Sequence, residues 1–153
     1  MNAPVFSAAQ PMGQGSDHPL GSLVLVSLVA EELGEIASPD QVDGFFAQVG
    51  RRVAEMFPLG DVQDLTGMEV RINGLWRELG LGEARMNVQG NSIVVRHEST
   101  RSDLAGMDGP WRPILAAMVR GAYDNWFRQL GSKSNLTTSA EWHGHVIELR
   151  HGR

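Results

Sequence analysis

The stretch from Pro110 to Gly131 has the sequence PWRPILAAMVRGAYDNWFRQLG and decides how the chain can fold. Its apolar residues recur at helical spacing in two rows that are offset from each other. The first row consists of Trp111, Ile114, Leu115, Met118, Ala122 and Trp126, and the second of Val119, Tyr123, Phe127 and Leu130. A helix that is apolar on most of its circumference needs cover on more than one side, so we expect the second row to face another subunit.

The length and composition indicate one folded domain preceded by an arm. The chain has 153 residues, of which 42% are hydrophobic and 20% charged, as in ordinary soluble globular proteins. Residues 1–19 contain three prolines, two glycines and few large apolar side chains. Because this composition cannot offset the entropy lost on ordering, we expect a flexible arm there and a single domain over residues 20–153.

Three helices are expected before any strand. The first covers residues 20–36, where the density of Leu and Val predicts a buried helix. Residues 38–41 supply a serine N-cap, a first-turn proline and the glutamine of a capping box for the second helix, which Pro58 ends. Asp61 is expected to cap the third helix and Gly80 to end it.

Beyond the third helix the apolar period changes from about 3.6 to 2, which predicts strands. One hairpin is expected around Gly90-Asn91, and a second, between residues 137–142 and 146–151, around His143-Gly144. The long helix lies between them. The fold class is therefore α+β, with three N-terminal helices, a β-hairpin, a long helix, a C-terminal β-hairpin and a small antiparallel sheet covered by helices.

Charge, cysteine content and hydropathy limit the partners and the compartment. The formal net charge is -5 and Lys133 is the only lysine, so we expect no binding to nucleic acid. The chain has no cysteine, which excludes disulfides and suits a reducing compartment. The most apolar run, Leu23 to Ala30, is too short to cross a bilayer, and no lysine or arginine precedes Arg51 as a secretory leader would require. We expect a protein that is not inserted in a membrane and favour the cytoplasm over the periplasm as its compartment.

Signals for catalysis or metal binding are weak. His143 and His145 form an H-x-H pair, but they straddle the predicted turn and lack a well-spaced acidic ligand, so solvated histidines are favoured over a metal site. His97 and Glu98 are neighbours on a strand and would point to opposite faces, which argues against a catalytic dyad. The chain also lacks a nucleophile elbow and a phosphate-binding loop. We expect no catalytic residue, no cofactor, no metal and no enzyme activity.

The aromatic residues allow two interpretations. Flat rings suit the apolar faces of sugars, and the candidates are Trp76, Trp111, Tyr123, Trp126 and Trp142. Aromatic residues at helical spacing are ordinarily packed, which favours a core or interface role instead. The residues expected at a helix-mediated contact between subunits, with the two arginines as polar partners, are Trp111, Val119, Arg120, Tyr123, Trp126, Phe127 and Arg128.

A series of short motifs runs in a fixed order through roughly Val42 to Arg150. The main ones are Trp111-x-Pro113-x-Leu115 and Gly121-x-Tyr123-x-x-Trp126-x-x-Gln129-x-Gly131. They are supported by Val49-Gly50-Arg51, Met56, Asn73-x-Leu75, Leu79-Gly80, His97 and Ile147-x-Leu149-Arg150. In this order and spacing the chain resembles the family of cellulose synthase operon protein D, the small D component of the bacterial cellulose synthase complex.

The resemblance implies a non-catalytic accessory role in cellulose synthesis and secretion. Members of that family form dimers that assemble into a cylinder-like homo-octamer, and they organise synthase complexes so that glucan chains crystallise. The implied partners are further copies of the chain and other components of the complex, and glucan itself is a candidate partner. Two alternatives stay open: a regulatory domain that binds a small ligand in an apolar pocket under the helices, and a polysaccharide hydrolase.

Overall fold

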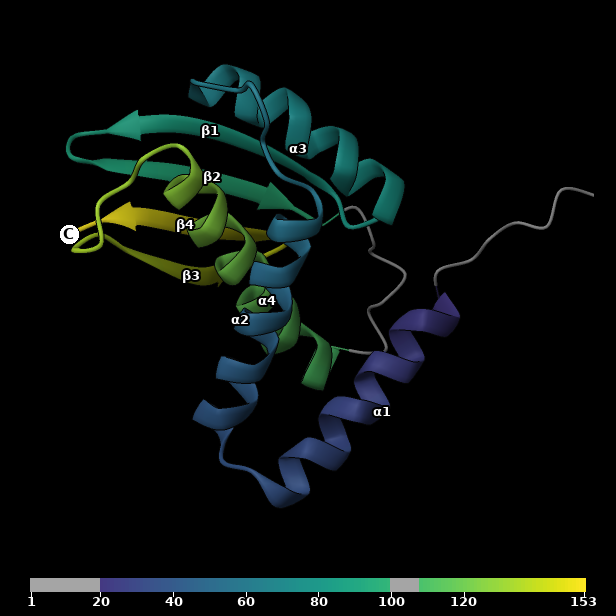
Figure 1. Cartoon of the computed structure of the whole chain (residues 1–153). Coiled ribbons are helices and arrows are strands. Elements are labelled where there is room, and N and C mark those ends of the chain that lie inside the picture. The colour runs from purple at the N-terminus through teal and green to yellow at the C-terminus, as the bar shows by residue number, and fades with distance from the viewer. Residues whose placement is uncertain (1–19, 100–107) are drawn as a thin grey trace, which may run out of the picture.

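The computed structural model describes residues 20–99 and 108–153, so the predicted arm and most of the loop before the long helix lie outside the described residues. The elements follow the predicted order (Figure 1). They are α1 (Leu20–Ile36), α2 (Pro39–Met56), α3 (Leu65–Leu79), β1 (Glu83–Gln89), β2 (Ser92–Glu98), α4 (Asp108–Gln129), β3 (Thr137–His143) and β4 (Val146–Gly152). The predicted α+β class, with helices covering a small antiparallel sheet, is confirmed.

The four strands form one antiparallel sheet in the order β1-β2-β4-β3. The first hairpin turns at Gly90-Asn91, as predicted. The second turns at Gly144-His145, one residue later than expected, because Gly144 takes the left-handed conformation at the first turn position (φ 63°) and His143 still pairs with Val146. One face of the sheet packs under the helices through alternating side chains that include Val95, His97, Ile147, Leu149 and His151.

The N-terminal cap predicted from the sequence is confirmed for α2 and wrong for α3. Ser38 and Gln41 form the complete capping box at the start of α2, as predicted. Asp61 was the wrong cap for α3. The backbone turns first, with the Val62 N–H bonded to the Leu59 carbonyl, so the helix begins later and Asp64 caps it by accepting from the Gly67 N–H at 2.7 Å.

Helices α2 and α4 cross with their backbones in contact. A β-carbon built on Gly50 would lie 1.8 Å from the Met118 carbonyl oxygen, and one built on Gly121 would lie 1.9 Å from the Ala47 carbonyl oxygen. Only glycine fits at these two positions, because any larger residue would force the helices apart. This crossing holds α4 between α2 and the sheet.

Both apolar rows of α4 are therefore covered within the chain. Tyr123 and Phe127 face the sheet, where they contact His97 and His151, and Trp126 packs on Trp76 of α3. The predicted interface residues that are buried, with exposures of 0% to 6%, are Trp111, Val119, Tyr123, Trp126 and Phe127. The expectation that these side chains face another subunit is wrong, because the fold of the same chain already encloses them.

Candidate interaction surface

Helix α1 is apolar on two sides but packs on only one of them. Its inner side, with Val26, Ala30 and Leu33, joins the core against α2 and α4. The opposite side, which we call the outer face of α1, consists of side chains that are between 41% and 83% exposed: Val24, Leu25, Leu28, Val29 and Ile36. Figure 1 shows α1 diverging from α2 at the edge of the molecule. The sequence predicted a buried helix here, and the structure leaves half of it exposed.

This exposed face is the strongest sign of a binding surface in the described part of the chain. Adjacent large apolar side chains on a soluble protein usually mark a site where another molecule binds. Covering a half-exposed side chain such as Leu28 would contribute on the order of 1 kcal/mol. The signal for this surface was in the sequence, because a helix that is apolar on two sides needs cover on both of them.

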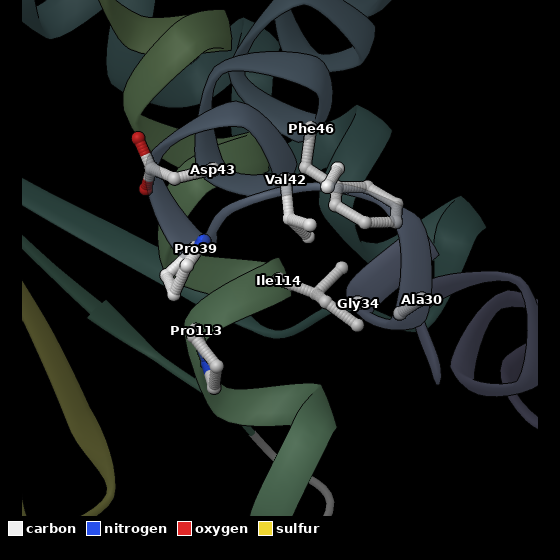
Figure 2. Close-up of a pocket in the computed structure, with 9 residues that line it drawn as sticks. Ala30, Gly34, Pro39, Val42, Asp43, Phe46, Pro113 and Ile114 are labelled. Atoms are coloured by element: carbon white, nitrogen blue, oxygen red, sulfur yellow. The ribbon is translucent and has the colours of Figure 1, made fainter. Parts of the chain in front are cut away.

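An apolar cavity lies beneath α1, between its C-terminal half, α2 and the first half of α4. Its volume is about 240 Å³. Val42 and Phe46 of α2 and Ile114 of α4 point toward one another in it, whereas Asp43 points away (Figure 2). The Asp43 carboxylate instead accepts two hydrogen bonds from Arg120, at 3.2 and 2.5 Å. The cavity therefore offers apolar contacts and no free charge.

The buried polar groups near the middle of α4 are linked in a series of hydrogen bonds. The Trp76 indole N–H donates to the Tyr123 hydroxyl at 2.9 Å, which in turn lies 3.2 Å from Nδ1 of His97. Nε2 of His97 lies 2.8 Å from the Leu81 carbonyl and must be the protonated nitrogen, so Tyr123 donates to Nδ1. Burial lowers the pKa of His97 to about 4 and raises that of Tyr123. Both side chains are neutral near pH 7, and their hydrogen bonds are used inside the core.

A second polar group fastens the end of α4 to the last hairpin. His151 stacks on Phe127, and its two ring nitrogens lie 2.5 Å from the Ser132 hydroxyl and 2.8 Å from the Thr138 hydroxyl. Thr138 in turn donates to Asp124 at 2.8 Å. Burial lowers the pKa of His151 against the opposing effect of Asp124. Because the residues are far apart in sequence and lack a common motif, the sequence did not predict this group.

The two predicted interface arginines are half-buried and already paired within the chain. Arg120 joins α4 to α2 through Asp43. Arg128 lies 3.3 Å from Asp124 and donates to the Leu136 carbonyl at 2.6 Å, which holds the loop after α4. These contacts give both arginines a role in the fold, and a further role between protomers stays a prediction.

The aromatic residues considered for sugar stacking do not form one exposed surface. Trp76, Trp111, Tyr123 and Trp126 are core residues, as favoured over sugar stacking. Trp142 is covered by the Arg112 guanidinium, which lies 4.5 Å from its ring.

Within residues 20–99 and 108–153, no three His, Cys, Asp or Glu side chains converge as a metal site would require. His143 is exposed and beside Glu141. Among the helices described, none is both long and apolar enough to span a membrane.

Comparison with known proteins identifies the family. The family model for the D component of cellulose synthase matches residues 21–152, which is nearly the whole described chain. No curated protein sequence matches. Among solved structures, the chain is similar to a trafficking protein particle complex subunit 3 from Naegleria fowleri covalently bound to palmitic acid, with 13% identity, a TM-score of 0.49 and coverage of 88% of this chain and 96% of that one. On the match of the family model, the chain belongs to the family of cellulose synthase D components.

Proposed function

We propose that this accessory component of cellulose synthesis is a non-catalytic scaffold that assembles with itself through the outer face of α1. The assembly would organise several synthase complexes so that their glucan chains are exported and crystallise together. The proposal depends on one observation, the exposed apolar side of α1: five large apolar side chains are exposed there, whereas α2 and α3 each expose two. The cytoplasmic location, the octameric number and direct contact with glucan stay predictions.

A second copy of the chain is the partner that suits this surface best. Four of the five apolar side chains of the outer face gather within residues 24–29, around Leu25 and Leu28, and Glu31, Glu32 and Glu35 follow toward the C-terminal end of α1, before Ile36. Two such helices packed about a two-fold axis in antiparallel orientation would bury both apolar stripes and keep the two acidic ends apart. A closed assembly then presents copies of one surface at fixed spacing. Repeated weak contacts with several synthases add up to stable alignment.

The direct test is the size of the protein in solution when the outer face is made polar. We expect the double variant Leu25→Lys with Leu28→Lys to sediment as a smaller species than the wild type at micromolar concentration. Lysine is chosen because position 28 precedes Glu31 and Glu32 by three and four residues, and these opposite-charge pairs offset the repulsion between the two introduced lysines, which are three residues apart. A matched control is Val70→Lys on α3, where the wild-type side chain is 69% exposed but stands outside this surface.

The functional consequence is measured in cells that make cellulose. Replacing the native protein by the double variant should reduce the crystallinity of the cellulose more than its total amount, whereas Val70→Lys should change neither. A wild-type protein that is monomeric at micromolar concentration would overturn the proposal. So would full cellulose crystallinity with a double variant shown to be monomeric.

The cavity beneath α1 favours a second candidate function, a regulatory domain that binds a small ligand. Its lining is almost entirely apolar, as ligand pockets commonly are. Its volume of about 240 Å³ lies below the range of about 300–1,000 Å³ that is usual for ligand sites, which makes this candidate the weaker one. Native mass spectrometry decides between them: a retained small molecule on a monomer supports the regulatory domain, and a ligand-free oligomer supports the scaffold.

A further inference from the structure

The two edge strands of the sheet, β1 and β3, differ in how their outward backbone groups are satisfied. In a hairpin with a two-residue turn, the pair that closes the turn is hydrogen-bonded, and the next pair points its N–H and C=O groups away from the partner strand. Gln89 and Ser92 close the first hairpin. The outward residues of β1 are therefore Ala84, Met86 and Val88.

Helix α3 caps the β1 edge at these outward groups. The Asn73 amide spans both groups of Ala84, accepting from its N–H at 2.7 Å and donating to its carbonyl at 2.8 Å. Glu69 accepts from the Met86 N–H at 2.7 Å. Ala84 and Met86 are both residues that the hydrogen-bonding pattern of the hairpin assigns as outward-pointing, so these bonds confirm the assignment. They also prevent another strand from adding at β1.

The β3 edge has no such caps among the described residues. His143 and Val146 close the second hairpin, so the outward residues of β3 are Thr138, Ala140 and Trp142. Their backbone groups have no bond to a side chain or to another element in the described part of the chain. The strand is seven residues long and contains neither proline nor lysine, and its one acidic residue is Glu141. It therefore lacks the devices that normally stop edge-to-edge pairing.

We propose that β3 pairs antiparallel with β3 of a second copy of the chain about a two-fold axis at Ala140, so that the two sheets become continuous. In this register Thr138 forms a hydrogen-bonded pair with Trp142 of the partner subunit, and each Ala140 pairs with its symmetry mate. On the exposed side of the sheet, Ser139 lies opposite Glu141 of the partner subunit. No two like charges face each other, so the strand is complementary to itself.

This contact rests on the self-assembly proposed above and adds a second, different surface to it. A single two-fold contact stops at a dimer, whereas two different two-fold contacts allow dimers to join into a larger closed assembly. The outer face of α1 supplies one contact through side chains, and the β3 edge supplies the other through the backbone. Each copy of the chain thus has two independent surfaces for self-association.

Charge replacement at Ser139 separates the proposed contact from effects on the protomer. Within its own sheet Ser139 lies opposite Arg150, so Ser139→Glu should stabilise the protomer and Ser139→Lys should destabilise it slightly. Across the proposed contact the signs reverse, because each new side chain faces Glu141 of the partner subunit. We expect Ser139→Glu to raise the dissociation constant of the larger species on the order of tenfold, through two symmetric like-charge pairs, and Ser139→Lys to lower it. Sedimentation velocity over a dilution series measures both.

Amide hydrogen exchange on the full-length protein gives a second, independent readout. In the assembled protein the N–H groups of Thr138, Ala140 and Trp142 should exchange slowly and become fast on dilution. Those of Ser139 and Glu141 bond to β4 and should stay protected at every concentration, which makes them internal controls.

Three outcomes distinguish this contact from the proposed function. Fast exchange of the three outward amides in the assembled protein would overturn the β3 contact, as would Ser139 variants that shift assembly and protomer stability in the same direction. The larger species could also dissociate in the double variant Leu25→Lys with Leu28→Lys and stay unchanged in both Ser139 variants. This result would overturn the β3 contact and still support the scaffold. A monomeric wild type would remove both.

Discussion

The body of the protein and its first helix differ in how far their side chains are packed and hydrogen-bonded within the chain. In the body, formed by α2, α3, α4 and the sheet, glycines bring helices into contact and the buried Trp76, Tyr123 and His97 bond to one another. In α1 the outer face is exposed. The one buried side-chain N or O atom without a hydrogen-bond partner in the described part of the chain, Ser27 Oγ, also lies on α1. A chain can thus form a well-packed body and still carry one helix with an exposed apolar face where a partner could bind.

The largest effect is expected where the body is tightest, at the crossing of α2 and α4. Gly121→Ala places a β-carbon against the Ala47 carbonyl oxygen and should lower the free energy of unfolding by about 3 kcal/mol. Gly44→Ala, in open space on the same helix pair, should instead raise it by about 0.5–1 kcal/mol. Urea unfolding measures both, and equal effects would show that the helices do not touch as described.

The buried histidine makes the stability of the body depend on pH. Unfolded, His97 titrates near pKa 6.5, and folded near 4, so only the unfolded chain takes up the proton between these values. The stabilisation is complete above pH 6.5 and is lost as the pH falls toward 4. From pH 7.5 to 5 we expect a loss of about 2 kcal/mol in the free energy of unfolding. In His97→Gln the pH dependence of the free energy of unfolding should weaken and keep only the contribution of His151, whose pKa is also lowered. An unchanged pH dependence would contradict the burial of His97.

Removing one hydroxyl from the series of buried hydrogen bonds should have a slightly smaller effect. Tyr123→Phe leaves the Trp76 N–H and Nδ1 of His97 without a partner inside the core, at a cost of about 1–2 kcal/mol in the free energy of unfolding. The variant should keep its assembly state, because the hydroxyl lies inside the protomer. A Tyr123→Phe protein that dissociates without loss of protomer stability would restore the original prediction of an interface along α4.

The smallest effect on protomer stability is expected on the outer face of α1. Leu28→Lys exchanges an exposed apolar side chain for a charged one, so dilute protomer should unfold within about 0.5 kcal/mol of the wild type. Its effect should fall on association instead. A loss of several kcal/mol in the dilute protein would place Leu28 in the core and end the contrast between α1 and the body.

The sequence predicted the elements well because their signals are local. The capping box of Ser38 and Gln41 and the turn at Gly90-Asn91 each depend on a few neighbouring residues, and both are confirmed. Asp61 failed as a cap because Asp64, three residues later, offers the same chemistry after a turn that the sequence does not mark.

What covers each helix could not be predicted, because cover depends on residues distant in sequence. The two rows of α4 correctly indicated two covered sides. They could not show that the second cover is the chain's own sheet, through contacts such as Tyr123 with His97 and Phe127 with His151. For α1 the error was the reverse: a helix rich in Leu and Val was expected to be buried, and its outer face is exposed.

The most direct test of the central claim is crosslinking through a single introduced cysteine. Because the chain contains no cysteine, Leu28→Cys and the control Val70→Cys each provide one unique thiol. If a second copy covers the outer face of α1, a short bismaleimide should convert the Leu28→Cys protein largely to a covalent dimer and leave Val70→Cys largely monomeric. Equal, low crosslinking of the two proteins at a concentration where both are assembled would contradict the account.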